Sequence, residues 1–229
     1  MRNFTNILIG TVLVAGVSAC AASAPAPSVA TTTPTPVAVQ AARADSIRRS
    51  FNRADVDFMT GMIHHHAQAL VMASMAPSHG ANPTIQTLAA RIINGQKGEI
   101  GLMSTWLADR DQPVPEVGHD SMAMDMHTDG HAMHSGDHHM DMPGMLSPEQ
   151  MEALDAARGI EFDRLFLTYM IQHHQGALTM VRELFDSYGA AQGDDIYRIA
   201  SGVEADQMAE IDRMQKMLIA MMFEPGSSQ

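Results

Sequence analysis

A fifteen-residue segment occurs twice in the chain, and this repeat limits the fold more than any other feature. Residues 58–72 read FMTGMIHHHAQALVM and residues 166–180 read FLTYMIQHHQGALTM. Aligned at a constant offset, each copy carries an adjacent histidine pair between two methionines, and a stretch of the form Q-x-x-E-I-x-x-M follows each copy further along the chain. A repeated helical hairpin can bury its apolar stripe against its sister copy, so the repeat predicts a helical bundle.

Helix-starting and helix-ending signals predict four long helices. Pro77 ends the first, Asn82 and Pro83 begin the second, and the capping sequence SPEQ at residues 147–150 begins the third. No segment alternates as a strand would, so we expect an all-α fold, a four-helix bundle. The expected parts are a first hairpin at residues 45–110, a connecting loop at 111–146, a second hairpin at 147–223 and a tail at 224–229. The first hairpin should begin with a helix at about 45–76. The second should consist of helices at about 147–189 and 194–223.

The start of the chain resembles an export signal. Arg2 precedes a short apolar run, and Val-Ser-Ala-Cys at residues 17–20 resembles a lipoprotein cleavage site. Cys20 is the single cysteine of the sequence and is our candidate for lipidation; a plain secretory signal is the alternative. Residues 21–44 are rich in Ala, Pro and Thr and are expected to form a flexible tether. We therefore expect an extracytoplasmic protein anchored to a membrane, in the periplasm or at the cell surface.

The charge balance restricts the partners. The chain has 26 acidic and 14 basic residues and a formal net charge of −12. Such a chain repels a phosphate backbone and attracts cations. Nucleic acid is therefore excluded as a partner, and metal ions are favoured.

Helical spacing directs the repeated histidines inward. On a helical wheel His65 and His66 share the apolar stripe with Met62, and His173 and His174 share it with Met170. The positions that the two downstream stretches share also face inward, and their polar members are Gln96, Glu99, Gln207 and Glu210. Buried polar groups must be satisfied by one another or by a ligand.

Two interpretations of this polar layer remain open on the stripe alone. In the first, the glutamates and glutamines accept hydrogen bonds from the imidazoles and form an inert layer that sets the register of the helices. In the second, one nitrogen of each imidazole faces a metal ion while a carboxylate holds the other, and nearby methionines add sulfur ligands. Methionine on an apolar face is usually core, so the stripe does not choose between them.

The connecting loop favours metal binding. Residues 119–145 contain six histidines, seven methionines and five aspartates and show no helical or strand period. Thioethers and imidazoles together favour Cu(I) or Ag(I), with Cu(II) as a second choice, whereas sulfur ligation of Zn(II) requires thiolate. A disordered linker of biased composition is the alternative. The candidate ligands in the loop are His119, Met122, Met124, Met126, His127, His131, Met133, His134, His138, His139, Met140, Met142 and Met145. His79, outside the loop, is expected to be an ordinary surface residue.

The two repeats carry a family resemblance. FMTGMIHHHAQA and FLTYMIQHHQGA, followed by QKGEIGLM and QMAEIDRM, resemble the family called domain of unknown function 305 over about residues 45–222. The resemblance implies a ferritin-like four-helix bundle of the exported, copper-binding type. It also implies a metal-ligand role for the repeated histidines and methionines, which are His65, His66, His173, His174, Met62, Met72, Met170 and Met180. His64 has no counterpart in the second copy, so the resemblance assigns it no role.

The function expected is that of a non-enzymatic copper buffer or chaperone. A copper exporter or another periplasmic copper protein is a candidate partner, and the sequence leaves homodimerisation open. The main alternative is a ferritin-like di-metal iron oxidase built on Glu99 and Glu210, although neither histidine-bearing helix shows the Glu-x-x-His spacing of such sites. Non-covalent haem ligation by Met and His, and a metal-independent envelope module, are the remaining alternatives.

Overall fold

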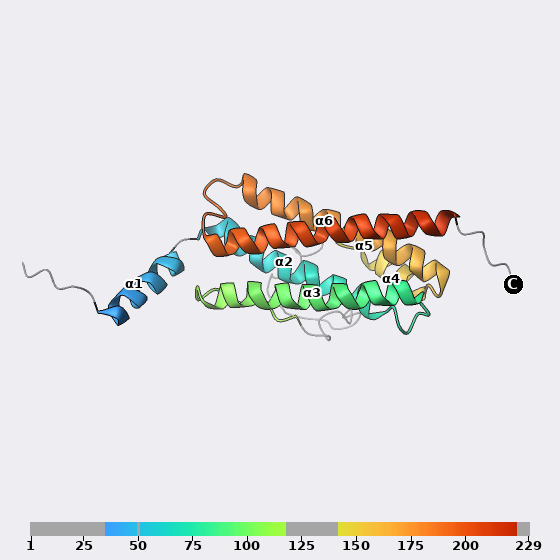
Figure 1. The fold of residues 1–229 in the computed structure, drawn as a ribbon, viewed down its shortest axis with the longest axis horizontal. Coiled ribbons are helices and arrows are strands. Elements are labelled where there is room, and N and C mark those ends of the chain that lie inside the picture. The colour runs from blue at the N-terminus through green and yellow to red at the C-terminus, as the bar shows by residue number, and fades with distance from the viewer. Residues whose placement is uncertain (1–34, 50, 118–141, 224–229) are drawn as a thin grey trace, which may run out of the picture.

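The computed structural model describes residues 35–49, 51–117 and 142–223, and within these ranges every regular element is a helix (Figure 1). The all-α prediction is confirmed over this part of the chain. The expected signal peptide at residues 1–20 and the tail at residues 224–229 lie outside it. The helices are α1 (Pro36–Arg49), α2 (Arg53–Ser74), α3 (Pro83–Ala108), α4 (Pro148–Ala156), α5 (Ile160–Asp186) and α6 (Asp194–Phe223).

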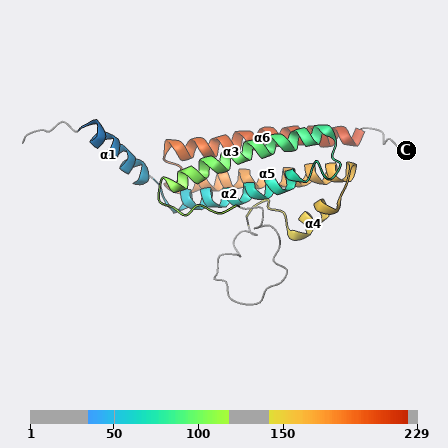
Figure 2. The ribbon, with the colours of Figure 1, turned by 90° about the horizontal axis from the view of Figure 1, so that it is seen from below.

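The four long helices pack as a bundle of two layers. Figure 2 shows α3 and α6 in one layer and α2 and α5 in the other, while α1 lies away from the bundle. The most extensive contacts join α2 to α3 and α5 to α6, and α2 also packs against α5. No helix among residues 35–49, 51–117 and 142–223 is long and apolar enough to cross a membrane.

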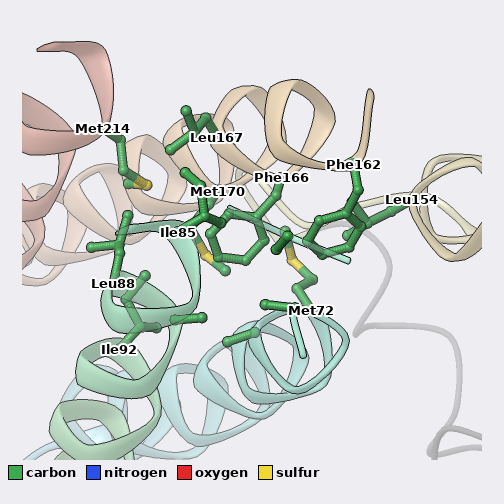
Figure 3. Packing of buried hydrophobic residues seen from close by; sticks show 14 of the residues in the cluster. Met72, Ile85, Leu88, Ile92, Leu154, Phe162, Phe166, Leu167, Met170 and Met214 are labelled. Carbon is green, nitrogen blue, oxygen red and sulfur yellow. The ribbon is translucent and has the colours of Figure 1, made fainter. Parts of the chain in front are cut away.

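Two clusters of buried apolar side chains fill the bundle. One includes Met72, Met170 and Phe166, which pack together with side chains of α3 and α6 (Figure 3). The other includes Met62 and Met180. Each cluster thus contains methionines of both sequence repeats, because α2 and α5 run antiparallel. The repeated histidines lie along the helices between the two clusters.

Local capping explains where the helices begin. Asn52 and Asp55 form a capping box at the start of α2, and the Asn82 side chain caps α3 ahead of the predicted proline. Ser147 caps α4 through the predicted capping box. The predicted starts at residues 82 and 147 and the predicted fourth helix at residues 194–223 are confirmed.

Two of the predicted helices are each divided in two. The expected first helix at residues 45–76 is wrong, because α1 ends at Arg49 and the capping box of Asn52 starts α2 as a separate helix. The helix α1 also crosses the expected end of the tether at residue 44, since its alanine-rich sequence favours helix. The expected third helix is likewise divided into α4 and α5, because Gly159 has a φ of +57° that a right-handed helix cannot accommodate.

Paired aspartates tie the two halves of the bundle together. Asp55 on α2 accepts a hydrogen bond from the backbone nitrogen of Ala191, in the turn between α5 and α6, at 2.7 Å. Asp163 on α5 accepts from the backbone nitrogen of Asn82, in the turn between α2 and α3, at 3.1 Å. The repeat alignment places Asp55 over Asp163, so each copy of the repeat holds the turn of the other half. Both carboxylates are buried.

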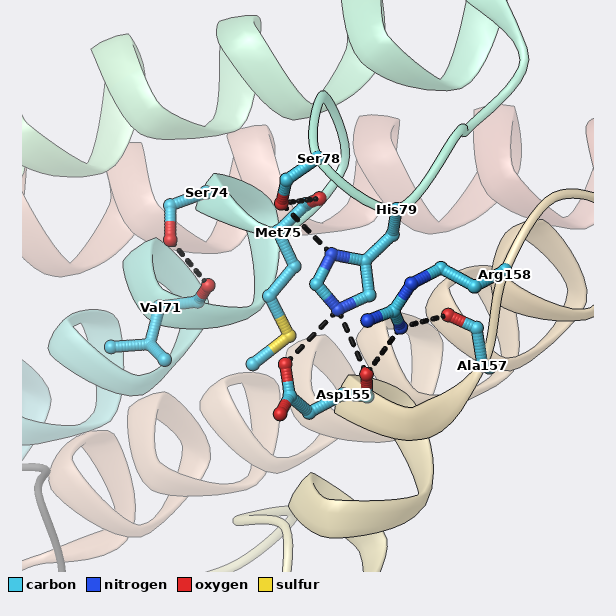
Figure 4. Close-up of polar contacts among 8 residues, drawn as sticks. All are labelled: Val71, Ser74, Met75, Ser78, His79, Asp155, Ala157 and Arg158. Atoms are coloured by element: carbon cyan, nitrogen blue, oxygen red, sulfur yellow. Dashed lines mark hydrogen bonds and ion pairs between the residues drawn. The ribbon is translucent and has the colours of Figure 1, made fainter.

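His79 is a structural residue, and the expectation of an ordinary surface position is wrong. Its side chain is buried in the turn between α2 and α3, with Nδ1 2.9 Å from the Ser78 hydroxyl oxygen. Nε2 lies 3.0 Å from Asp155 Oδ1 on α4 (Figure 4). The contact partner is 76 positions away in sequence, so no local pattern could have indicated it. The turn is thereby fixed to α4.

Candidate metal centre

Four histidine side chains lie in the middle of the bundle with no solvent exposure. His65 and His66 come from α2, and His173 and His174 come from α5, as the helical wheel predicts. The ring centroids of His65 and His173 are 3.8 Å apart, so the two helices bring one imidazole from each repeat into contact. The two sequence repeats therefore meet at this pair of histidines.

In each histidine pair, one imidazole is hydrogen-bonded to a glutamate. His66 Nε2 lies 2.7 Å from Glu99 Oε2 on α3, and His174 Nε2 lies 2.6 Å from Glu210 Oε2 on α6. A carboxylate can only accept, so each Nε2 carries the proton and each Nδ1 keeps a free lone pair. These two hydrogen bonds were predicted from the sequence. They fix the tautomer that presents Nδ1 to a ligand.

A segment from the end of the connecting loop holds His65. His65 Nε2 donates to the carbonyl oxygen of Pro143 at 3.0 Å. Gln68 on α2 exchanges two hydrogen bonds with the backbone of Leu146, at 3.0 and 2.8 Å. Residues 142–147 are therefore docked across α2 and α5, and we call them the docked segment.

The docked segment changes the interpretation of two predicted loop ligands. Met142 and Met145 belong to it and are half-buried, so these two candidate ligands are partly shielded from solvent. The Met142 sulfur and the Met180 methyl both lie over Gly61, at 3.4 and 3.3 Å from the position that a Cβ would take there. The remaining loop candidates and Cys20 lie outside the described residues.

Glycine provides the space for the docked segment. A Cβ on Gly176 of α5 would stand 1.9 Å from the Pro143 carbonyl oxygen, and a Cβ on Gly144 would stand 2.6 Å from the carbonyl oxygen of Gln172. The repeat alignment places Gly176 opposite Gln68, so the two copies differ at the positions that contact the docked segment. Sequence reasoning missed these residues, and the mismatch within the repeat was the signal that could have found them.

Several buried polar atoms near the histidines have no hydrogen-bond partner within the described ranges. All four histidines have an unpartnered Nδ1, and His173 also lacks a partner at Nε2. Each unsatisfied buried group costs about 1–3 kcal/mol. Hydrogen bonds within the layer therefore account for only part of its polar atoms. The unpartnered atoms are Nδ1 of His65, His66, His173 and His174, Nε2 of His173, Oε1 and Nε2 of Gln96, and Oε1 of Gln207.

Burial keeps the central pair of imidazoles neutral. Burial, with the neighbouring His66 as the next cause, lowers the pKa of His65 to about 3. Burial and the adjacent His65 lower the pKa of His173 well below its ordinary value. Neutral imidazole is the form that binds a metal, so protons do not compete for these nitrogens near neutral pH.

The side chains around the histidines are not arranged as a di-metal centre. In the described part of the chain, no three His, Cys, Asp or Glu side chains converge closely enough to hold a metal ion. Glu99 and Glu210 each bind a histidine instead of bridging a shared point. Cu(I) and Ag(I) accept few ligands and favour imidazole and thioether donors, and methionines of both repeats flank the histidines. The di-iron alternative is not favoured.

The fold is similar to those of several solved structures, among them a copper-related protein. A DUF305 fragment from Deinococcus radiodurans is 27% identical with a TM-score of 0.59, and the match covers 73% of this chain and 97% of that one. CopM in its Cu(II)-bound form is 29% identical with a TM-score of 0.54, covering 73% and 97%. CopM in its Cu(I)-bound form is 27% identical with a TM-score of 0.53, covering 73% and 96%.

The sequence itself was compared with protein families and with curated proteins. No curated protein matches it. The family described as Domain of unknown function (DUF305) matches residues 55–218, which includes α2 to α6 and both histidine pairs. The match covers well over half of the chain. This protein belongs to the DUF305 family.

Proposed function

We propose that this protein binds Cu(I) and Ag(I) outside the cytoplasm and acts as a metal buffer or chaperone, without catalysing a reaction. The observation that carries the proposal is the set of unpartnered imidazole nitrogens in the bundle interior. A ligand that accepts their lone pairs would remove the cost of burying them. The similarity to CopM, which has been solved with Cu(II), Cu(I) and silver, supports the same choice of metals.

In this proposal the inner site uses one imidazole pair and the flanking sulfurs. His65 and His173 supply nitrogen, and thioethers such as Met62 and Met180 supply sulfur from the adjoining cluster. Glu99 and Glu210 hold the neighbouring imidazoles in the tautomer that presents Nδ1. Thioether ligands suit an oxidising compartment, because they cannot form disulfides as thiols do.

The other parts of the proposal concern residues outside the bundle core. The His- and Met-rich residues 119–141 would collect metal at several sites, and a lipid on Cys20 would hold the protein at a membrane. A copper exporter or a second periplasmic copper protein would receive the metal. The arrangement as two ferritin-like hairpins is supported by the close packing of α2 with α3 and of α5 with α6.

Metal analysis of four proteins tests the proposal. We expect the wild type to bind several Cu(I) ions under reducing conditions, and a deletion of residues 119–141 to bind fewer while keeping full helicity. Adding leucine at His65, His66, His173 and His174 to that deletion should remove the tight binding that remains, because leucine has no lone pair to donate.

The control for the leucine variant is His64→Gln, since glutamine stands at the equivalent position of the second repeat. It should keep the wild-type copper content. Equal copper content in the deletion with and without the four leucines would contradict the inner site. Equal content in the wild type and the deletion would contradict the role of the loop.

A further inference from the structure

The docked segment covers one side of the histidine layer. It lies across α2 and α5, binding His65 through Pro143 and packing against Gly176. The imidazoles of His65 and His173 have no exposed surface. An ion that reaches them must therefore pass through some other part of the bundle or displace this segment.

A groove on the opposite side lies next to the two neighbouring imidazoles, those of His66 and His174. It lies between α3 and α6, the layer that faces away from the docked segment, and has a volume of about 230 Å³. Glu99 and Glu210 line it, and each is hydrogen-bonded to an imidazole, His66 and His174 respectively. The two carboxylates are 13% and 22% exposed while the imidazoles are fully buried. The two carboxylates therefore lie between the groove and the imidazoles of His66 and His174.

The groove also contains polar atoms that lack partners. Gln96 and Gln207 line it and are 2% and 1% exposed. Both polar atoms of the Gln96 amide and the carbonyl oxygen of Gln207 have no hydrogen-bond partner within the described residues. Unsatisfied amide oxygens beside two carboxylates attract a cation, and because oxygen is a weak donor for a soft ion they hold Cu(I) or Ag(I) less tightly than imidazole does.

We propose that the α3–α6 groove is the access route of the metal ion, where a hydrated cation is held by the carboxylates and amides before it passes to the imidazoles. This inference rests on the proposed function of the inner site. Glu99 and Glu210 would release their histidines as the ion arrives and bind them again behind it. No bond is made or broken other than these hydrogen bonds and the ion's own ligand exchange.

The charges along the groove suit passage more than permanent binding. Asp206 also lines it, and burial together with Glu99 and Glu210 raises the pKa of Asp206, as expected for carboxylates that face one another. The guanidinium groups of Arg91 and Arg213 lie along the same groove and oppose the three acids. The acidic groups also do not converge on one point. A cation is thus attracted without being held tightly.

Gly95 allows the route to be blocked without disturbing the packing. It lines the groove on α3, and a Cβ at this position would meet no atom within 4 Å. Phenylalanine there should fill the cavity, and any side chain favours helix over glycine. Ala209, exposed on the α6 side, offers a second position for the same block. Gly101 is the matched control, because it also lies on α3 with open space around it but does not line the groove.

The test measures how fast copper leaves the full-length protein. Cu(I)-loaded protein is mixed with excess bathocuproine disulfonate, and the inner-site phase is identified as the one missing from a His65→Leu/His173→Leu variant. We expect Gly95→Phe and Ala209→Phe to slow this phase by at least about tenfold, since the ion then leaves only when helices open. Gly101→Phe should leave the rate unchanged, and all three should keep the wild-type copper content.

The alternative outcomes separate this inference from the proposed function. A wild-type rate in both groove variants would overturn the access route. Displacement of the docked segment would then be the way in which the ion reaches the imidazoles. Loss of copper from the groove variants would overturn it too, since the groove would then be part of the site. If wild type and the double leucine variant release copper identically, the inner site itself is absent and both proposals fail.

Discussion

Replacing Gly176 with alanine should destabilise the metal-free protein by about 2–4 kcal/mol, because the new methyl group overlaps the docked segment. Its Cβ would stand 1.9 Å from the Pro143 carbonyl oxygen, which is backbone and cannot rotate aside. The segment must move off α5, and the hydrogen bond from His65 to Pro143 is then lost. Unfolding in urea, followed by circular dichroism, measures the change.

A loss of stability at Gly176 would be opposite in sign to the usual effect of replacing a helical glycine with alanine. Alanine normally stabilises a helix relative to glycine by about 0.5–1 kcal/mol. Gly98 on α3 is the matched control, because a Cβ there meets no atom within 4 Å, and Gly98→Ala should show that ordinary gain. If Gly176→Ala were as stable as the wild type, the docked segment would not be held against α5 as described.

The stability of the metal-free protein should fall steeply as the pH drops below about 6.5. Burial lowers the pKa of His65 to about 3 and that of His173 well below its ordinary value, so the folded state leaves both imidazoles unprotonated. The unfolded chain binds these protons near pH 6.5, so acid favours unfolding. The two histidines together should cost about 3 kcal/mol between pH 6.5 and pH 5, and the loss continues toward the folded pKa values.

His173→Leu gives the comparison for this pH dependence. The variant lacks one of the two imidazoles, so its stability should fall about half as much from this cause over the same range. Removing two unpartnered nitrogens should also make it more stable than the wild type at neutral pH, by about 1–3 kcal/mol. Urea unfolding at several pH values measures both effects. A slope equal to that of the wild type would contradict the buried neutral state of His173.

The repeat predicted those features that both copies share. Helical spacing placed His65 and His173 on inward faces, and the downstream stretch placed Glu99 and Glu210 near them, because these depend only on local period and on the antiparallel packing of equivalent helices. The interpretation as an inert layer also has Gln96 accepting from an imidazole, but its amide has no partner in the described ranges.

The features that the sequence did not reveal depend on contacts between non-equivalent segments. The docked segment is held by hydrogen bonds between its backbone and side chains 78 positions away, for example between Leu146 and Gln68. Every residue has the same backbone groups, so the sequence does not indicate such contacts. The division of the third helix depends on Gly159, whose backbone nitrogen donates to the His79 carbonyl oxygen at 2.9 Å. Composition alone made Met142 a candidate ligand of the loop, whereas its position depends on a tertiary contact with Gly61.

Nuclear magnetic resonance of ¹⁵N-labelled histidine, recorded while Ag(I) is added, shows whether the inner imidazoles bind the metal. We expect metal-free His65, His66 and His174 to carry the proton on Nε2, and Ag(I) to shift the nitrogen signals of His65 and His173 in slow exchange. Signals of these two side chains that stay unchanged while the loop histidines shift would contradict it, and the inner imidazoles would then have no part in holding the metal.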